Sequence, residues 1–246
     1  MTAAEARGAR TAVLRALTDL LIAAHSGQTL RVAVDGPDAA GKTILADEVA
    51  RRLAERGRPV IRASIDAFHH PVSVRRRRGS LSPEGYFFDA FDYDALRRLL
   101  LDPLGPSGNR LYRPAAFDFR IDAAVDEPAR LAAPDAVLLL DGVFLLREEL
   151  SACWDLSVFL QISPAESLRR ALHRDIELFG SPGAVRDRYL ARYLPGQSIY
   201  FLHAAPQEHA DILIDNESPD APRILRWPGA ATHADLPSTH SSHRTS

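Results

Sequence analysis

The sequence predicts an α/β fold in which one domain is built on a mainly parallel, five-stranded sheet with helices on both faces. Short apolar, β-branched runs alternate with longer stretches in which apolar residues recur at helical spacing. The run Ala136 to Leu140 is apolar without interruption, as expected for a strand that is buried on both faces of a parallel sheet. The chain has 246 residues, of which 46% are hydrophobic, so it can fill one sizeable core.

The first half of the chain is expected to open with an amphipathic helix and to continue with strand–helix units. Gly27 stops the opening helix, and turn-rich residues separate the next strand from its helix. In chain order we expect a helix over Ala3 to His25, a strand over Leu30 to Asp35, a helix over Thr43 to Arg56, a strand over Pro59 to Ile65, a loop over His69 to Gly85, a helix over Tyr93 to Leu101 and a hairpin within Leu111 to Val125.

The second half is expected to complete the sheet with strands over Ala136 to Leu140, Leu156 to Ile162 and Asp211 to Ile214. Ser163, Pro164 and Glu166 form a capping-box pattern, which predicts a helix from this point to about Phe179. A further helix is expected over Ala184 to Leu202, with an interruption near Pro195.

The predicted domain spans residues 1–218, with an N-terminal helix in 1–27 and a lid with its following helix in 163–202. Residues 219–246 are rich in Pro, Ser, Thr, Ala and His and contain few large apolar residues. Because such a segment buries too little apolar surface to offset its ordering entropy, we expect it to be a mobile tail.

Charge and cysteine content exclude several classes of protein. Thirty basic and 32 acidic residues leave a net charge of −2, so no overall field attracts nucleic acid or an anionic membrane. No apolar run approaches the length of a membrane span, and the N-terminus lacks a signal-peptide pattern. The single cysteine, Cys153, suits a reducing compartment. We therefore expect a cytoplasmic protein with neither a nucleic-acid nor a membrane partner.

A phosphate-binding motif, G-x-x-x-x-G-K-[ST], lies between the first expected strand and the helix after it. Glycines let the backbone N–H groups wrap around phosphate oxygens, and the helix N-terminus adds positive potential. Lys42 is the only lysine among the 30 basic residues, and a compact ammonium fits such a loop better than a guanidinium. The motif predicts a three-layer, P-loop NTPase-type fold that binds ATP through Gly36, Asp38, Ala39, Ala40, Gly41, Lys42 and Thr43.

The same lysine count argues against a GTPase, because no second lysine exists to build the N-K-x-D motif that reads guanine. No L-S-G-G-Q-like sequence accompanies the loop, which argues against a transporter ATPase.

Two carboxylates end predicted strands, at Asp66 and Asp141. Carboxyl ends of parallel strands share one edge of the sheet with the phosphate loop, so both side chains are expected near the γ-phosphate position. Asp66 could accept the proton of an attacking hydroxyl. Thr43, Asp66 and Asp141 together supply the oxygen ligands that Mg²⁺ prefers.

Two further segments suggest an acceptor site and a closing element. Tyr86 to Tyr93 combines aromatic faces with Asp89 and Asp92, which suits the stacking of a base and hydrogen bonding to sugar hydroxyls; half of these residues could instead belong to the core. Arg170 and Arg174 are four residues apart on the capped helix and could screen the charge of the transferring phosphoryl group, or form a solvated face. Arg75 to Arg78 could be a solvated loop, help to hold an anionic ligand or close over the site.

Taken together, these stretches resemble the uridine kinase and phosphoribulokinase family over roughly Arg31 to Asn216. The specific parts are the phosphate loop, the S-x-D-x-F-[YH]-like element Ser64 to His69, the pair Asp141-Gly142 and the lid-like arginines. The resemblance implies that Asp66 is the catalytic base, that Thr43 and Asp141 serve the metal, and that Lys42, Arg170 and Arg174 act on the phosphates. It also implies acceptor contacts from Phe68, His69, Phe117 and either Asp89 or Asp92.

The chain departs from this family at two points. Uridine kinases typically carry glutamate at the position of Asp141 and tyrosine at the position of Phe117, and the lost hydroxyl would weaken the recognition of a pyrimidine. The sequence therefore predicts an ATP- and Mg²⁺-dependent kinase of a small-molecule hydroxyl, with the 5′-hydroxyl of a nucleoside as the acceptor. The alternatives are pantothenate, a sugar phosphate or nicotinamide riboside as acceptor, or a regulatory protein that binds ATP without turnover.

Overall fold

The computed structural model describes residues 2–24 and 27–229. The helices are α1 (Ala3–Ala23), α2 (Lys42–Glu55), α3 (Val72–Arg75), α4 (Pro83–Asp89), α5 (Tyr93–Leu96), α6 (Pro164–Arg174), α7 (Ile176–Phe179), α8 (Pro182–Arg188), α9 (Leu194–Ala204) and α10 (Pro206–His209). The strands are β1 (Leu30–Asp35), β2 (Val60–Ser64), β3 (Leu111–Tyr112), β4 (Phe117–Asp118), β5 (Ala123–Ala124), β6 (Arg130–Leu131), β7 (Val137–Gly142), β8 (Leu156–Gln161), β9 (Ile212–Asp215) and β10 (Arg223–Arg226). Short 3₁₀ turns cover Ile65–Phe68 and Glu148–Cys153, and π-helical turns cover Arg97–Leu101 and Tyr189–Tyr193.

The central sheet has the strand order β10-β9-β8-β1-β7-β2. Its five strands from β9 to β2 are parallel, as predicted, whereas β10 pairs with β9 in the antiparallel sense. This sixth strand corrects the expectation that the mobile tail begins at residue 219. Arg223 pairs with Asp215 in the ladder, and Trp227 packs against the apolar core, so the chain remains ordered to at least this point. The rest of the predicted tail, 230–246, lies outside the described residues.

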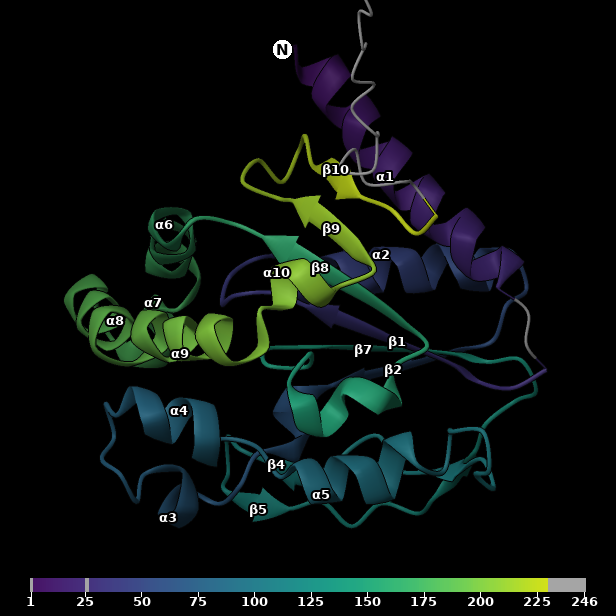
Figure 1. The fold of residues 1–246 in the computed structure, drawn as a ribbon. Helices are drawn as coiled ribbons and strands as arrows, with labels where there is room; N and C mark the ends of the chain where they lie inside the picture. The colour runs from purple at the N-terminus through teal and green to yellow at the C-terminus, as the bar shows by residue number, and fades with distance from the viewer. Residues whose placement is uncertain (1, 25–26, 230–246) are drawn as a thin grey trace, which may run out of the picture.

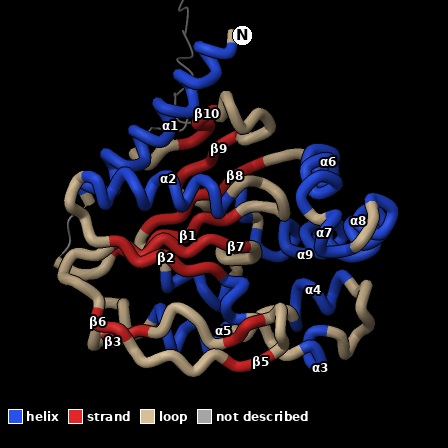
Figure 2. The backbone as a smooth tube through the Cα atoms, turned by 180° about the vertical axis from the view of Figure 1, so that it is seen from behind, coloured by secondary structure: helices blue, strands red, loops and turns tan. Residues whose placement is uncertain are grey.

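Alternating side chains of the central strands build two apolar layers, one on each face of the sheet. Val32 and Val34 of β1 pack with α1 and α2, whereas Ala33 packs with α4, α5 and α9. Figures 1 and 2 show α1 and α2 on one side of the sheet and α4 and α5 on the other. The predicted three-layer α/β architecture is therefore confirmed.

Helices α6 to α9 gather beyond the carboxyl ends of the parallel strands (Figure 1). Ser163 caps α6 by accepting a hydrogen bond from the Glu166 N–H at 3.1 Å. The other half of the expected capping box is replaced, because the Ser163 N–H donates to Glu217 instead. The helix ends at Arg174, five residues before the predicted end, and α7 follows it after Asp175.

Two other expectations about helices need correction. The predicted interruption near Pro195 is absent, because this proline occupies the first turn of α9, where no N–H is required. A π-helical turn precedes it instead. The expected loop His69 to Gly85 contains α3 and the start of α4, which Ser82 caps by accepting from the Gly85 N–H at 2.9 Å.

The expected hairpin within Leu111 to Val125 is formed by β4 and β5, while β3 pairs with the more distant β6. The predicted end of the first helix at His25 lies outside the described residues, and α1 ends at Ala23. No described helix combines the length and apolar character needed to cross a membrane.

Candidate active site

The phosphate loop joins the end of β1 to the start of α2. A Cβ atom at Gly36 would lie 2.5 Å from the Leu160 carbonyl oxygen, and Gly41 has a φ of 91°, so both positions require glycine. The Lys42 ammonium donates to the Pro37 carbonyl at 2.7 Å and so curls back over the loop. Burial lowers the pKa of Lys42, although Asp38, Asp35 and Asp141 oppose this shift.

Two cavities meet at this loop. One, of about 620 Å³, is lined by Gly41, Arg170 and Asn216, together with Arg10 of α1. The other, of about 380 Å³, is lined by residues that include Asp66 and His69. Ala39, Lys42, Thr43 and Arg174 line both cavities. We call the first the nucleotide cavity and the second the acceptor cavity, after the roles that the sequence predicts for the residues lining them, and Lys42 lies where they join.

Asp66 follows β2 and lies in the 3₁₀ turn, at the wall of the acceptor cavity. Enclosure by the surrounding protein raises the pKa of its carboxyl, an effect that His69 and Lys42 oppose and that Asp38 and Asp141 reinforce. The Nδ1 atom of His69 is 2.9 Å from the Asp66 carbonyl oxygen, and burial lowers the pKa of this imidazole. Asp66 is thus a carboxylate that gains a proton more readily than one in water.

Asp141 and Thr43 form a pair at the same edge of the sheet. The strand register places Asp141 opposite Val34 of β1 and Ser64 of β2. The Thr43 hydroxyl donates to Asp141 Oδ2 at 2.6 Å, and Arg62 donates to Oδ1 at 2.9 Å. A hydroxyl and a carboxylate in this arrangement are oxygen donors of the kind that could hold a phosphate-bound Mg²⁺. No group of three acidic, histidine or cysteine side chains suited to a metal occurs among the residues that the structure describes.

The two predicted lid arginines differ in their surroundings. Arg170 donates to the backbone oxygens of Ala39 at 3.2 Å and Asn216 at 2.6 Å and is paired with Glu166, so it braces the phosphate loop. Arg174 is more exposed, pairs with Asp175 and lines both cavities. Arg174 is therefore the better placed of the two to touch a transferring phosphoryl group.

Several residues predicted to contact the acceptor lie elsewhere. Phe68 is fully buried in the core, and Phe117 does not line the acceptor cavity, where Phe119 is found instead. Asp92 caps α5 by accepting from the Ala95 N–H at 2.8 Å. Of the predicted acceptor residues, His69 is the one that the structure brings into the cavity.

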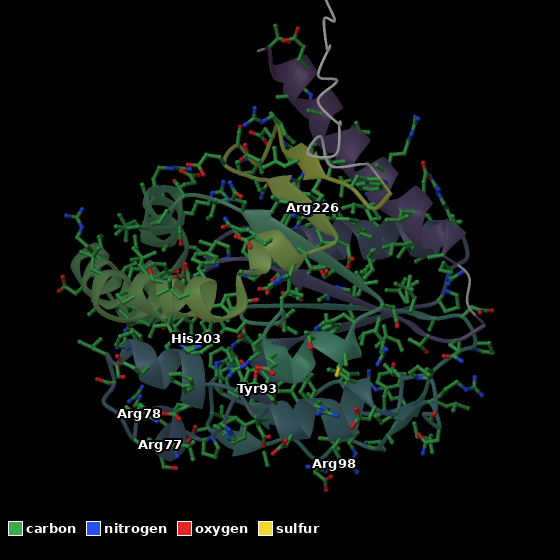
Figure 3. The ribbon with its side chains drawn as sticks, in the orientation of Figure 1. Arg77, Arg78, Tyr93, Arg98, His203 and Arg226 are labelled. Carbon is green, nitrogen blue, oxygen red and sulfur yellow. The ribbon has the colours of Figure 1, made fainter. Side chains whose placement is uncertain are left out.

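Asp89 has a different role from the predicted contact with ribose. Its carboxylate is enclosed and binds Arg77 and Arg78, which lie beside α4 at the edge of the molecule (Figure 3). Arg75 binds Asp122. These ion pairs hold the loop against neighbouring segments while Arg76, Arg77 and Arg78 remain exposed, which agrees with the solvated loop weighed from the sequence.

Asp35 is a buried group that the sequence reading missed. Its carboxylate, at the end of β1, accepts hydrogen bonds from the N–H groups of Gly36, Leu145 and Leu146 and from the Tyr200 hydroxyl. Burial raises its pKa to about 6, against the opposing effect of these donors and of Lys42. The signal was present as an acidic residue that ends a strand in which all other residues except Arg31 are apolar. Tyr193, which also lines the acceptor cavity, gave no such signal, whereas Phe91 belongs to the aromatic segment Tyr86 to Tyr93 that the sequence singled out.

Comparison with known proteins supports this geometry. The chain is 27% identical over 191 residues to uridine-cytidine kinase B of Dictyostelium discoideum, a match that covers 77% of this chain and 76% of the relative. It is 27% identical over 193 residues to the uridine kinase of Leuconostoc citreum, covering 75% and 86%. The chain is a distant homologue of the uridine kinases. No protein-family model matches it.

Solved structures show the same fold as this uridine kinase homologue. A possible uridine kinase from Bacillus stearothermophilus superposes with a TM-score of 0.65 at 20% identity, covering 81% of this chain and 96% of its own. A protein named as a fructose transport system kinase, from a Silicibacter species, gives a TM-score of 0.65 at 23% identity, covering 78% and 95%. At identities below 30%, these matches indicate distant homology to P-loop kinases of small molecules.

Proposed function

We propose that this uridine kinase homologue transfers the γ-phosphoryl group of ATP, with Mg²⁺, to the 5′-hydroxyl of a nucleoside. The observation that carries the proposal is the junction of the two cavities at Lys42, with Asp66 on the acceptor side and the Thr43–Asp141 pair beside it. A phosphoryl transfer needs this set: a cation on the phosphates, an oxygen pair for the metal and a base that faces the acceptor.

Each residue of the site is assigned a role from its position. Gly36 to Thr43 hold the phosphates through backbone N–H groups, while Lys42 balances their charge. Thr43 and Asp141 would hold Mg²⁺, which neutralises phosphate charge when bound. Asp66 orients the acceptor hydroxyl and accepts its proton, and the raised pKa of this carboxyl makes it a better base. Arg174, on α6, lines both cavities and would contact the transferring phosphoryl group.

A nucleoside acceptor is supported by flat rings in the acceptor cavity. The ring centroid of His69 lies 4.5 Å from that of Phe91 and 4.8 Å from that of Phe119, and all three residues line the cavity. Such faces favour a planar base over a compact polyol. This support replaces Asp89 and Asp92, which the structure places outside the cavity lining.

The substitution Asp66→Asn tests the proposal, since it preserves size while removing the proton acceptor. We expect kcat to fall by about 10²-fold or more while ATP binding stays within a few-fold of wild type. ADP release would be measured with and without a mixture of nucleosides, and it should rise several-fold when the mixture is added to the wild type. The exposed Asp94→Asn on α5 is the matched control and should behave as the wild type.

An unchanged kcat in Asp66→Asn would remove this residue from catalysis. A wild type that binds ATP but never responds to a small-molecule hydroxyl would instead indicate a regulatory ATP-binding protein.

A further inference from the structure

The side chain of Asp38 belongs to the acceptor side of the site, whereas its backbone is part of the phosphate loop. Asp38 belongs to the phosphate loop, yet it lines the acceptor cavity together with Asp66 and His69. Asp38 does not line the nucleotide cavity, whereas Gly41 and Asn216 do. A carboxylate on the phosphate loop therefore faces the acceptor.

The Asp38 carboxylate is held in place by neutral donors. The Tyr86 hydroxyl donates to its two oxygens at 2.9 and 3.1 Å, and the Gln197 amide donates to Oδ2 at 2.5 Å. Both donors are buried, at 6% and 4% exposure, so the carboxylate is fixed by α4 and α9. An ionised carboxylate offers about four acceptor positions, which leaves capacity for hydroxyl groups of a ligand.

The carboxylates that line the acceptor cavity differ in whether a cationic side chain is paired with them. Asp141 is paired with Arg62 and Asp175 with Arg174, whereas the donors to Asp38 carry no charge. Lys42 and Arg174 lie where the two cavities meet and serve the phosphates of ATP.

The remaining cationic side chain of the acceptor cavity is Arg120. It is exposed, and its guanidinium carbon lies 5.9 Å from the ring centroid of Phe119. An acceptor in this cavity consequently meets the two carboxylates Asp38 and Asp66, which both line it.

We propose that Asp38 is a specificity-determining residue of the acceptor site, where it accepts hydrogen bonds from acceptor hydroxyls and, with Asp66, excludes anionic acceptors. The inference rests on the proposed kinase function and narrows it to uncharged or cationic acceptors. Among the classes compatible with the sequence, nucleosides and nicotinamide riboside fit, whereas pantothenate and sugar phosphates carry the wrong charge. Like-charge repulsion is an effective way to reject a competitor that is otherwise similar.

Binding of defined compounds tests this inference separately from catalysis. Uridine, cytidine, adenosine, nicotinamide riboside, pantothenate and ribose 5-phosphate would each be titrated calorimetrically into the full chain with Mg²⁺ and a non-hydrolysable ATP analogue. In the wild type we expect binding to be confined to the uncharged and cationic compounds. Asp38→Asn should weaken their binding by about tenfold or more, the usual effect of losing a charged hydrogen-bond partner. The affinity ratio of anionic to neutral compounds should rise.

Two further variants distinguish recognition of the acceptor by Asp38 from a structural role of Asp38 in the phosphate loop. Tyr86→Phe removes one donor but keeps the carboxylate, so acceptor affinity should fall less than about threefold, with anionic compounds still excluded. Asp187→Asn, on the exposed part of α8, controls for the loss of one negative charge. The affinity for the ATP analogue should change less than about twofold in all three variants.

A wild type that binds pantothenate or ribose 5-phosphate as well as nucleosides would overturn the inference. Equal losses of acceptor and ATP-analogue affinity in Asp38→Asn would also overturn it, because a brace of the phosphate loop predicts that result. The expected selectivity without any ADP formation would leave Asp38 as the selecting residue and refute the kinase function instead.

Discussion

At the residue scale, Asp35 shows how a buried carboxylate ties the phosphate loop to the rest of the fold. Its oxygens accept hydrogen bonds from Gly36 in the loop, from Leu145 and Leu146 after β7, and from Tyr200 of α9. These donors come from three separate segments, which all depend on one side chain. The raised pKa of about 6 shows that burial outweighs the stabilisation of the charge by the donors.

The raised pKa of Asp35 determines how the free energy of unfolding changes with pH. The protonated form is favoured in the folded state between an ordinary pKa of 3.8 and the folded value of about 6, so the Asp35 contribution is largest at low pH and is lost as pH rises through 6. Between pH 4.5 and 7.5 the contribution should fall by about 2 kcal/mol. Denaturant unfolding of wild type and Asp35→Asn at several pH values measures this, as a shrinking difference in free energy of unfolding. A difference that grows or stays constant with pH would contradict it.

At the element scale, the packing of α4 against α9 positions the acceptor side of the site. A Cβ atom at Gly196 of α9 would lie 2.7 Å from Cδ1 of Tyr86 and 3.2 Å from the Pro83 carbonyl oxygen. The Tyr86 ring cannot easily yield, because Phe144 and Tyr193 each pack against it edge-to-face at 4.9 Å. Glycine is therefore required at 196 for the helices to approach closely.

Gly196→Ala should accordingly destabilise the protein by about 1–3 kcal/mol, since overpacking exceeds the gain in helix propensity. Gly8→Ala in α1 is the matched control, because nothing lies within 4 Å of its added Cβ, and it should be neutral or stabilising by up to about 1 kcal/mol. Urea unfolding of both variants measures the contrast. Equal effects from the two substitutions would show that the α4–α9 contact tolerates an extra methyl group.

The sequence predicted elements better than contacts. The parallel strands and the phosphate loop were recognisable because apolar runs and the Gly-Lys-Thr motif are local patterns, and one sheet edge necessarily collects Asp66 and Asp141. The place of Asp89 was not recognisable, because its partners Arg77 and Arg78 lie 12 and 11 residues upstream on a loop that folds back. The strand β10 gave no signal either, since a short, largely exposed edge strand has no clear apolar alternation.

At the scale of the whole molecule, β10 and Trp227 extend the fold into a segment that was expected to be a mobile tail. Removal of 230–246 should leave the unfolding temperature within about 2 °C of wild type, because this segment contains few large apolar residues. Removal of 221–246 also deletes β10 and Trp227, so a fall of about 5–10 °C is expected. Thermal unfolding of the two shortened proteins distinguishes these cases. Equal melting temperatures would mean that β10 adds no stability.

Under the proposed function, the two cavities that meet at Lys42 would hold the phosphate chain of ATP and the acceptor hydroxyl. The most direct test is to identify the phosphorylated product. The full chain would be incubated with ATP, Mg²⁺ and an equimolar mixture of nucleosides, nicotinamide riboside, pantothenate and ribose 5-phosphate, and the products analysed by ³¹P NMR and mass spectrometry. We expect a nucleoside 5′-monophosphate as the main product. Phosphate found only on pantothenate or the sugar phosphate, or on no compound at all, would contradict it.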